Sequence, residues 1–557
     1  MGWARRQPLG LWVSGSAGTR GVPCLAMRRI LVSILLAALL TTAVGSFVQA
    51  RRTDASSDPG WITETGPPEM VVATPILSVR RTPGWVSAPV TRTRLLERLS
   101  GVVEEPSAPP QTCLAVYRGA APVVSERADA LMVPASLMKV VTAAAILEIA
   151  GPAATYTTEV LVRADALSTA ADGVLVGDVY LVGGGDPVLS TLAYVRRFDQ
   201  PIVHTDFTEL AVEAAAALRA QGILTVEGGI VADESRFPEA ERDYTTQVVE
   251  PDAGSVWKRS YVNNNQVGPL SALLLNDGYV SFPPSADSAS RSQNVRAPDP
   301  ALHAAQVLDG LIEARGVGVS ADAGKGTAPP LSELRSLATV ESPPMAEIVA
   351  RMLRNSDNTT AEMLLKEIGR RLSGSARAEA VQGVQDVLER LLGVQTAGIV
   401  IADGSGLSVH NRLTCDLIAE LLLRAGPDSP LVRGLAVVGE SGTLRDCDAG
   451  LEPAAGAGAG PDGQSPLSRT VWAKTGTLND VSALAGVTVA RNGDVLTFSL
   501  IANREGLFLS TCNDLQQGLI RAVSGHPYGP SSADAALHPA PARQPVVAPI
   551  AELADSE

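Results

Sequence analysis

The stretch Pro-Ala-Ser-Leu-Met-Lys-Val-Val-Thr-Ala-Ala-Ala-Ile-Leu-Glu-Ile-Ala-Gly, residues 134–151, carries the strongest local signals in this chain. Its apolar run, with Pro134 just ahead of the start and Gly151 just past the end, predicts a buried helix. Ser136 and Lys139 stand at its beginning, and a spacing of three residues places both side chains on one helix face. Serine is a weak nucleophile without an adjacent base, so the pair is a candidate nucleophile and base.

Lysine is rare in this chain, with five positions (139, 258, 325, 366 and 474) among 45 basic residues. A lysine where arginine is the usual basic residue indicates a need for a compact ammonium that can lose its proton. We expect burial and the nearby charge of Lys474 to lower the pKa of Lys139. The start of a helix also favours negative charge on Ser136.

Two further motifs follow in order. Ser-Asp-Asn at 356–358 lies between helical patterns at 345–354 and 360–372, and Lys-Thr-Gly at 474–476 lies in a predicted strand at 470–478. The chain also holds a second S-x-x-K at 255–258 and a second S-x-N at 292–294. Both of these lie in polar sequence with no core helix beside them, so we reject them as chance matches.

The third motif opens a predicted hairpin, with strands at 482–490 and 495–503 joined by a turn that contains Asn492-Gly493. We expect Gly476 to let a substrate backbone approach the edge of the first strand. The backbone N–H groups of Ser136 and Thr477 are then candidate oxyanion donors, and Lys474 is the candidate partner of a substrate carboxylate.

The chain carries further sequence blocks at 177–187, 231–237, 403–408 and 442–445. Together with the three motifs, which are typical of β-lactamases and penicillin-binding proteins, they make residues 95–525 resemble one family. The resemblance is to the low-molecular-mass class C penicillin-binding proteins, the D-alanyl-D-alanine carboxypeptidase/endopeptidase family. It implies an α+β fold, with a β-lactamase/transpeptidase-like catalytic domain (an antiparallel sheet flanked by helices) and a large inserted region of one or two smaller mixed domains.

The resemblance also implies roles for individual residues. Ser136 would be acylated, Lys139 would be its base, and Ser356 and Asn358 would shuttle protons and contact the substrate amide. The carboxylate and oxyanion side would be formed by Lys474, Thr475, Gly476 and Thr477, and the side chain of the wall peptide would be contacted by Asp233, Phe237 and Arg445. The alternative for the last three is a structural role. We interpret Asp178 with the glycines after it, and the segment 403–406, as turn and packing residues.

The predicted domain organisation begins with an N-terminal segment at 1–50. Its apolar run after Arg28-Arg29 and the sequence Val48-Gln49-Ala50 are typical of an export signal, with a true start at Met1 or Met27. An uncleaved membrane anchor is the alternative. The segments that follow are a Pro/Ser/Thr-rich linker at 51–94, the catalytic domain at 95–154 and 341–525, the insertion at 155–340 and a disordered tail at 526–557.

Composition excludes several classes of function. A net charge of −14 argues against nucleic acid as a partner. The five histidines have no metal-ligand spacing and there is no phosphate-binding glycine motif, so no metal or cofactor is expected. Outside the N-terminal segment the cysteines are Cys113, Cys415, Cys447 and Cys512, which allow two disulfides in three pairings or four buried thiols.

The leading hypothesis is an exported, extracytoplasmic serine-type D-Ala-D-Ala carboxypeptidase that acts on peptidoglycan stem peptides and is inhibited by β-lactams. Endopeptidase action on cross-links is a further activity of the same site. The alternatives are a β-lactamase and a catalytically silent protein that binds the cell wall. We expect the insertion to serve recognition of the wall peptide and not the chemistry.

Overall fold

The chain divides into residues 1–81 and 82–557, and every residue that the computed structural model describes lies in the second unit. The predicted export signal lies outside the described residues, and so does Ser255, the serine of the rejected S-x-x-K match. Among the described helices, none is long and apolar enough to cross a membrane. The described residues are 84–104, 111–237, 257–286, 293–372, 377–390, 393–394, 396–447, 470–490, 493–505 and 512–528.

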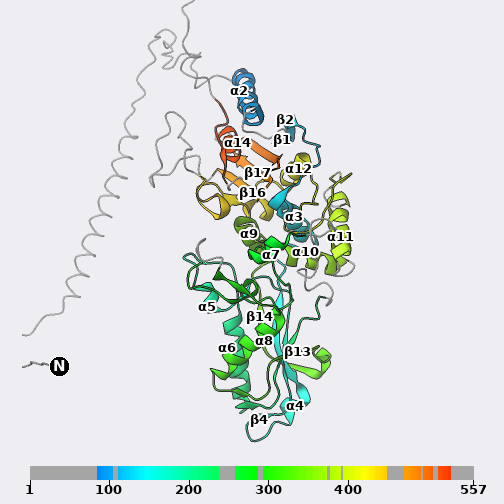
Figure 1. The fold of residues 1–557 in the computed structure, drawn as a ribbon, viewed down its shortest axis with the longest axis vertical. Coiled ribbons are helices and arrows are strands. Elements are labelled where there is room, and N and C mark those ends of the chain that lie inside the picture. Colours follow the sequence, from blue (N-terminus) through cyan, green and yellow to red (C-terminus); the bar gives the residue numbers. More distant parts are fainter. Residues whose placement is uncertain are drawn as a thin grey trace, which may run out of the picture. The chain divides into compact units, whose positions relative to one another are not determined.

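A six-stranded antiparallel sheet forms the centre of the catalytic domain (Figure 1). Its strand order is β15-β16-β17-β18-β1-β2, so β1 from before the insertion pairs with β18 from near the end of the described chain. The predicted hairpin is present as β17 and β18. The strand bounds are β1 Gln111–Arg118, β2 Ala121–Glu126, β15 Ala436–Val437, β16 Val471–Leu478, β17 Val481–Val489 and β18 Val495–Asn503.

The two faces of this sheet pack into different hydrophobic clusters, because side chains alternate along each strand. On β1, Cys113 and Ala115 belong to one cluster, whereas Leu114 and Val116 belong to the other. Helices α3, α9, α10, α11 and α12 contribute to the first cluster, and α2 and α14 contribute to the second. Their bounds are α2 Gly84–Glu104, α3 Met138–Ala150, α9 Met345–Asn355, α10 Asn358–Leu372, α11 Arg377–Arg390, α12 Cys415–Ala425 and α14 Asp514–Ser524; α13 is Pro430–Arg433.

Two predicted boundaries are wrong by several residues. Helix α2 begins at Gly84, inside the predicted linker, and its residues Leu95 and Leu99 are buried against the sheet. At the other end, His526 is 2% exposed and its Nε2 lies 2.8 Å from a carboxylate oxygen of Asp494, so it belongs to the folded domain. Both segments are short and weakly apolar in sequence, and packing on the sheet is what orders them.

The inserted region has a hydrophobic core of its own, built by helices α6 and α8 against a mixed sheet of order β13-β9-β5-β3-β14. In this sheet β5, β9 and β13 are parallel, and β3 and β14 are antiparallel to their neighbours. The described elements of the insertion are β3 Thr157–Arg163, α4 Ala164–Ser168, β4 Val174–Leu175, β5 Val179–Val182, β6 Leu189–Ser190, α5 Leu192–Val195, β7 Thr205–Asp206, α6 Phe207–Ala220, β8 Thr225–Val226, β9 Ile230–Asp233, α7 Arg259–Asn263, β10 Tyr279–Ser281, β11 Val295–Arg296, α8 Pro300–Glu313, β12 Gly318–Val319, β13 Gly324–Lys325 and β14 Leu334–Glu341.

All four candidate cysteines are in disulfides. Cys113 on β1 is bonded to Cys415 at the start of α12, and Cys447 is bonded to Cys512. The first bond therefore joins the two parts of the catalytic domain on either side of the insertion. Of the alternatives left open by the sequence, the structure selects two disulfides in this pairing.

Candidate active site

Ser136 lies in a short 3-10 helix, η2 (Ala135–Leu137), which leads directly into the buried helix α3. Lys139 sits in the first turn of α3 and is fully buried. Its Nζ donates a hydrogen bond to Ser136 Oγ at 3.1 Å. The predicted pairing of hydroxyl and amine on one face is therefore present.

Lys139 Nζ has two more acceptors, Asn358 Oδ1 at 2.7 Å and the backbone carbonyl oxygen of Ser405 at 2.5 Å. Burial lowers the pKa of Lys139 to about 8, while the carboxylates of Asp403 and Glu362 act in the opposite direction. The amine is thus held at a fixed position and close to its titration point near neutral pH.

The second motif forms the corner between α9 and α10. Ser356 ends α9 in the left-handed conformation, with φ 56° and ψ 41°. Asp357 stabilises the start of α10, because its Oδ1 accepts a hydrogen bond from the backbone N–H of Thr360 at 3.0 Å. Asn358 faces Lys139 with its oxygen, and its Nδ2 donates to the carbonyl oxygen of Gln266 at 2.9 Å.

The third motif lies on β16. Lys474 is fully buried, and burial together with the charge of Lys139 holds the pKa of Lys474 well below its usual range. We predicted that burial and the charge of Lys474 would together lower the pKa of Lys139. Burial does so, but the mutual repulsion falls on Lys474, since Lys139 has carboxylates beside it. The Oγ1 of Thr475 lies 2.8 Å from the Oγ1 of Thr443.

Gly476 has a packing reason that the sequence did not indicate. A Cβ at this position would lie 2.9 Å from the carbonyl oxygen of Pro134 and 3.3 Å from the Cβ of Ala135. Only glycine therefore lets β16 pack closely against the segment that carries Ser136. Thr477, the next residue, is half-buried on the same strand.

The loop at 403–408, whose residues 403–406 we interpreted as turn and packing residues, has a larger role in the site. Its Ser405 carbonyl holds Lys139, and the backbone N–H groups of Gly404 and Ser405 donate to Glu362 Oε1 at 3.1 and 2.8 Å. Gly406 has a φ of +85°, and a Cβ there would overlap the carbonyl oxygen of Ala135. The repeated glycines of this block were the available sequence signal.

The insertion also contributes to the site, contrary to our expectation. The Nε1–H of Trp257 donates to Asp403 Oδ2 at 2.9 Å, and the carbonyl of Gln266 accepts from Asn358. Asp403 in turn accepts hydrogen bonds from the backbone N–H groups of Gly406 and Ser408 within its own loop. Sequence reasoning missed Trp257 because it lies in the S-x-x-K match that we rejected.

The three wall-peptide candidates lie in different environments. Asp233 is buried, and its two carboxylate oxygens accept hydrogen bonds from the backbone N–H groups of Ser235 and Ala328. Phe237 is 1% exposed inside a hydrophobic cluster. Arg445 is exposed and follows the turn that carries Thr443. The cluster around Phe237 also contains Leu407 of the 403–408 loop, and Leu478 after the third motif packs against it.

A pocket of about 680 Å³ is lined by residues that flank the first and third motifs in sequence and by residues of the insertion. Val133 precedes η2, Leu478 and Asn479 follow the third motif, and Tyr261 comes from the insertion. In the described parts of the chain, no group of three His, Cys, Asp or Glu side chains is placed to hold a metal ion.

A serine hydroxyl that contacts a buried lysine of lowered pKa, at the start of a helix packed on an antiparallel sheet, defines an active-site serine acyl-transfer enzyme. A family model described as the D-Ala-D-Ala carboxypeptidase 3 (S13) family matches residues 113–282 and 281–519. The chain belongs to this family, and the predicted class, a serine-type D-Ala-D-Ala carboxypeptidase, is confirmed.

Similar proteins agree with this assignment. A D-alanyl-D-alanine carboxypeptidase of Actinomadura sp. is 30% identical over 432 residues, which cover 67% of this chain and 73% of the relative. A carboxypeptidase of Mycobacterium tuberculosis is 30% identical over 395 residues, covering 68% of this chain and 72% of the relative. The crystal structure of penicillin binding protein 4 from Haemophilus influenzae has a TM-score of 0.58 at 18% identity, covering 76% of this chain and 98% of that chain. This last similarity confirms the predicted fold class.

Proposed function

We propose that this carboxypeptidase acts through an acyl-enzyme on Ser136, with Lys139 as the base. The observation that carries the proposal is the 3.1 Å hydrogen bond between Lys139 Nζ and Ser136 Oγ. Burial lowers the pKa of Lys139 to about 8. At neutral pH roughly a tenth of the molecules then hold the amine in its neutral form, which can accept a proton.

In the acylation step, neutral Lys139 takes the proton of Ser136, and Oγ attacks the carbonyl carbon of the penultimate D-alanine. The tetrahedral intermediate collapses with cleavage of the C–N bond, and the terminal D-alanine leaves with a proton returned from Lys139, with Ser356 as the candidate shuttle. Water then attacks the ester, and the shortened peptide and free Ser136 are released. Asn358 is the candidate contact to the substrate amide, since its side chain is held by Gln266.

The substrate carboxylate is assigned to Lys474, with Thr475 beside it. The lowered pKa of Lys474 supports this assignment, because a carboxylate that enters the site would restore the favourable charged form of the lysine. The backbone N–H groups of Ser136 and Thr477 are the proposed oxyanion donors. Gly476 contributes by keeping β16 close to Ser136.

The pocket of about 680 Å³ is the proposed place for the rest of the stem peptide, because Val133 and Leu478, which line it, flank the first and third motifs. Asp233, Phe237 and Arg445 stay the candidate contacts to the side chain of the wall peptide. Arg445 is exposed and follows Thr443, whose Oγ1 lies 2.8 Å from the Oγ1 of Thr475. A cross-linked peptide would enter the same cleft, which is the basis for proposing endopeptidase activity.

Export to an extracytoplasmic compartment is proposed from the sequence at 1–50, with either a cleaved signal or a retained membrane anchor. The disulfides Cys113–Cys415 and Cys447–Cys512 support it, because disulfides persist in oxidising compartments. β-Lactams are the proposed inhibitors. Attack of Ser136 on the lactam carbonyl would open the ring in the same way that it cleaves the peptide bond, and would leave the inhibitor bound to Ser136 as an ester.

The test is to incubate the purified protein with a defined pentapeptide and with a cross-linked peptide dimer, and to identify the products by mass. Loss of one D-alanine from the pentapeptide is expected, and Ser136→Ala should give none. Mass mapping after labelling with a fluorescent penicillin should place the adduct on Ser136. An adduct on Ser255, or turnover that survives in Ser136→Ala, would mean that the nucleophile has been assigned wrongly.

A further inference from the structure

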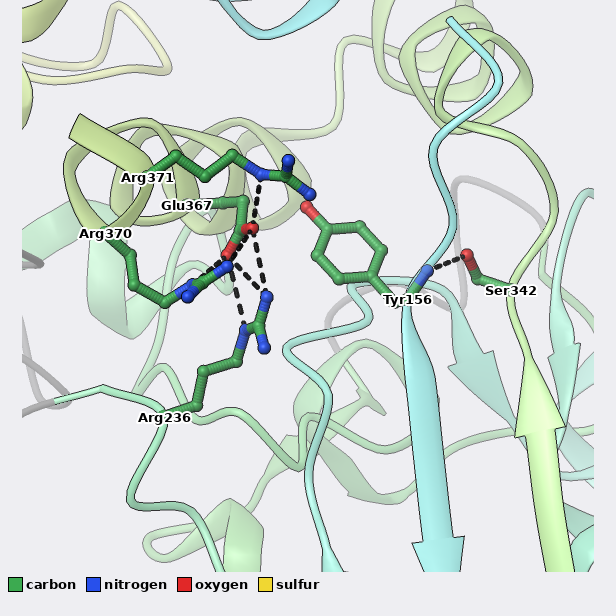
Figure 2. Close-up of polar contacts among 6 residues, drawn as sticks. All are labelled: Tyr156, Arg236, Ser342, Glu367, Arg370 and Arg371. Atoms are coloured by element: carbon green, nitrogen blue, oxygen red, sulfur yellow. Dashed lines mark hydrogen bonds and ion pairs between the residues drawn. The ribbon is translucent and has the colours of Figure 1, made fainter. Parts of the chain in front are cut away.

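A charged cluster lies at the far end of α10, away from the catalytic motifs (Figure 2). Glu367 has a fully buried side chain, and three guanidinium groups converge on its carboxylate. Arg370 and Arg371 come from the same helix, whereas Arg236 reaches across from the insertion. The shortest N–O distances are 3.0 Å for Arg236, 3.0 Å for Arg370 and 2.7 Å for Arg371.

The cluster holds three arginine side chains against the one carboxylate of Glu367, whereas a structural ion pair needs only one. Burial disfavours the charged form of Glu367, but hydrogen bonds from Arg370 and the charge of Arg236 hold the pKa of Glu367 below its usual value. The carboxylate therefore stays ionised and fixes the three guanidinium groups in place. Each guanidinium has five N–H donors in a planar fork, so donors remain for another anion.

A pocket of about 340 Å³ opens beside this cluster, lined by Arg236 and Arg370 together with Val182, Gly183, Asp233 and Ser235. Both carboxylate oxygens of Asp233 accept hydrogen bonds from backbone N–H groups at 2.8 Å, so this side chain is anchored to the backbone. No lining residue is shared with the pocket of about 680 Å³.

The pocket also lies where ligands commonly bind in sheets of this kind. Strands β5 and β9 are parallel neighbours that end at Val182 and Asp233, and the pocket is lined by these residues and those that follow. In open α/β sheets the crevice outside the carboxyl ends of parallel strands is the usual ligand site. Here the guanidinium groups come to that crevice from α10 and from the segment after β9.

The glycines after β5, which we interpreted as turn and packing residues, give the cluster its room. Gly185 has a φ of +82°, and a Cβ there would lie 2.9 Å from Cδ of Arg236. A larger residue would push the arginine side chain out of its path to Glu367. The glycine-rich block is thus tied to the placement of Arg236.

We propose that this pocket is an oxyanion-binding site, which takes a carboxylate or phosphate group between Arg236 and Arg370. The planar guanidinium fork matches both groups in geometry. Glu367 and Asn358 lie on one helix, and a rise of 1.5 Å per residue separates them by about 13 Å along its axis. The site is therefore distinct from the catalytic centre and does not depend on the proposed mechanism.

The proposal is tested by calorimetric titration of the full-length protein with sodium phosphate and, separately, with sodium acetate, at constant ionic strength set with chloride. Saturable binding is expected in at least one titration, and the anion that binds identifies the group as phosphate or carboxylate. Arg370→Gln should weaken this binding about tenfold or more, because it removes a charged hydrogen-bond donor. Arg424→Gln is the matched control, since Arg424 pairs with Glu420 on the surface of α12.

Absence of saturable binding of both anions, or equal binding by the wild type and Arg370→Gln, would overturn the proposal. A second measurement uses only the wild-type protein, so it does not depend on whether a variant folds. Crystals of the wild type soaked in selenate should give an anomalous peak between Arg236 and Arg370. Peaks that occur only elsewhere would count against the site. Acylation by penicillin is measured in parallel, so failure of the oxyanion site and failure of the catalytic assignment are told apart.

Discussion

Lys139 and Lys474 are both fully buried, but they need different properties to do their work. In the proposed mechanism Lys139 must lose a proton, and its three acceptors hold the nitrogen at the serine hydroxyl. The same proposal requires Lys474 to hold a positive charge when a carboxylate arrives. Its lowered pKa means that substrate binding and proton uptake are linked at this residue.

This difference predicts opposite responses to arginine. Lys139→Arg should abolish acylation by penicillin and by peptide, because arginine keeps its proton in proteins. Lys474→Arg should retain measurable acylation, since arginine also pairs with a carboxylate. Lys474→Ala should lose more, on the order of 2 to 5 kcal/mol of transition-state stabilisation. Single-turnover acylation rates at matched circular dichroism are the measurement. If Lys139→Arg acylates as fast as Lys474→Arg, the base must be sought elsewhere.

The pKa of Lys139 also predicts a pH dependence. Below about pH 8 the lysine is mostly protonated, so the acylation rate constant should rise with pH and level off above that value. The sign follows from the neutral amine being the active form. Stopped-flow acylation by a chromogenic penicillin between pH 6 and 10 measures it, with circular dichroism at each pH as the control. A rate that is flat from pH 6 to 8 contradicts the assignment.

At the scale of elements, the catalytic centre depends on how closely three backbone segments approach one another. The start of α3, the strand β16 and the loop at 403–408 are packed so tightly that glycine is required at Gly476 and Gly406. Backbone groups thereby reach Lys139 directly, as the carbonyl of Ser405 does.

The crowding at Gly406 can be separated from its backbone conformation. Gly426 has a similar positive φ of +78° but open space where a Cβ would lie. Gly426→Ala should cost about 1–3 kcal/mol of stability from backbone strain and leave acylation unchanged. Gly406→Ala should cost more and slow acylation strongly, because its Cβ displaces the segment that carries Ser136. Urea unfolding and acylation rates compare the two variants. Equal effects on both measurements would argue against tight packing at Gly406.

At the scale of the whole molecule, the insertion and the catalytic domain share one active site. Trp257 and Gln266 of the insertion hold Asp403 and Asn358 of the catalytic domain. A deletion of the insertion would therefore remove contacts to the chemistry as well as surface for the wall peptide.

A single substitution tests this coupling without removing the domain. Trp257→Phe keeps the aromatic ring but loses the N–H donor to Asp403, so the loop that holds Lys139 is less constrained. We expect acylation by a small penicillin to slow by roughly tenfold, the worth of about one hydrogen bond to a charged group. Tyr194→Phe, within the insertion and packed on Phe198 and Phe282, is the control and should acylate normally. An unchanged rate in Trp257→Phe would restrict the insertion to substrate recognition.

The two disulfides should differ in their effect on global stability. Cys113 and Cys415 are 302 residues apart in sequence, whereas Cys447 and Cys512 are 65 apart. A larger closed loop restricts the unfolded chain more, by about 1.4 kcal/mol for this ratio of lengths. The double alanine variant of the first pair should therefore be the less stable in urea unfolding. A more stable first variant would show that native-state effects outweigh chain entropy.

Much of the candidate site was readable in the sequence because it rests on residue type and local spacing. Ser136 and Lys139 are three residues apart on a helix, Ser356 lies between two helical patterns, and Lys474 lies on a strand of a hairpin. The structure places Lys139 within hydrogen-bond distance of both Ser136 and Asn358. The predicted limits of the catalytic domain at residues 95 and 525 were less accurate. The folded domain includes Gly84 and His526, because packing on the sheet orders the segments at both ends.

By itself, the sequence determined the class of chemistry, because a nucleophile, a titratable amine and an apolar helix leave a pattern of residue types. Only the tertiary structure decided what holds that chemistry in place. The carbonyl groups of Ser405 and Gln266 are backbone atoms that every residue has, so no residue type marks them in advance. Disulfide pairing and the meeting of Arg236 with Glu367 are likewise long-range contacts, which depend on how distant segments pack and not on the local sequence.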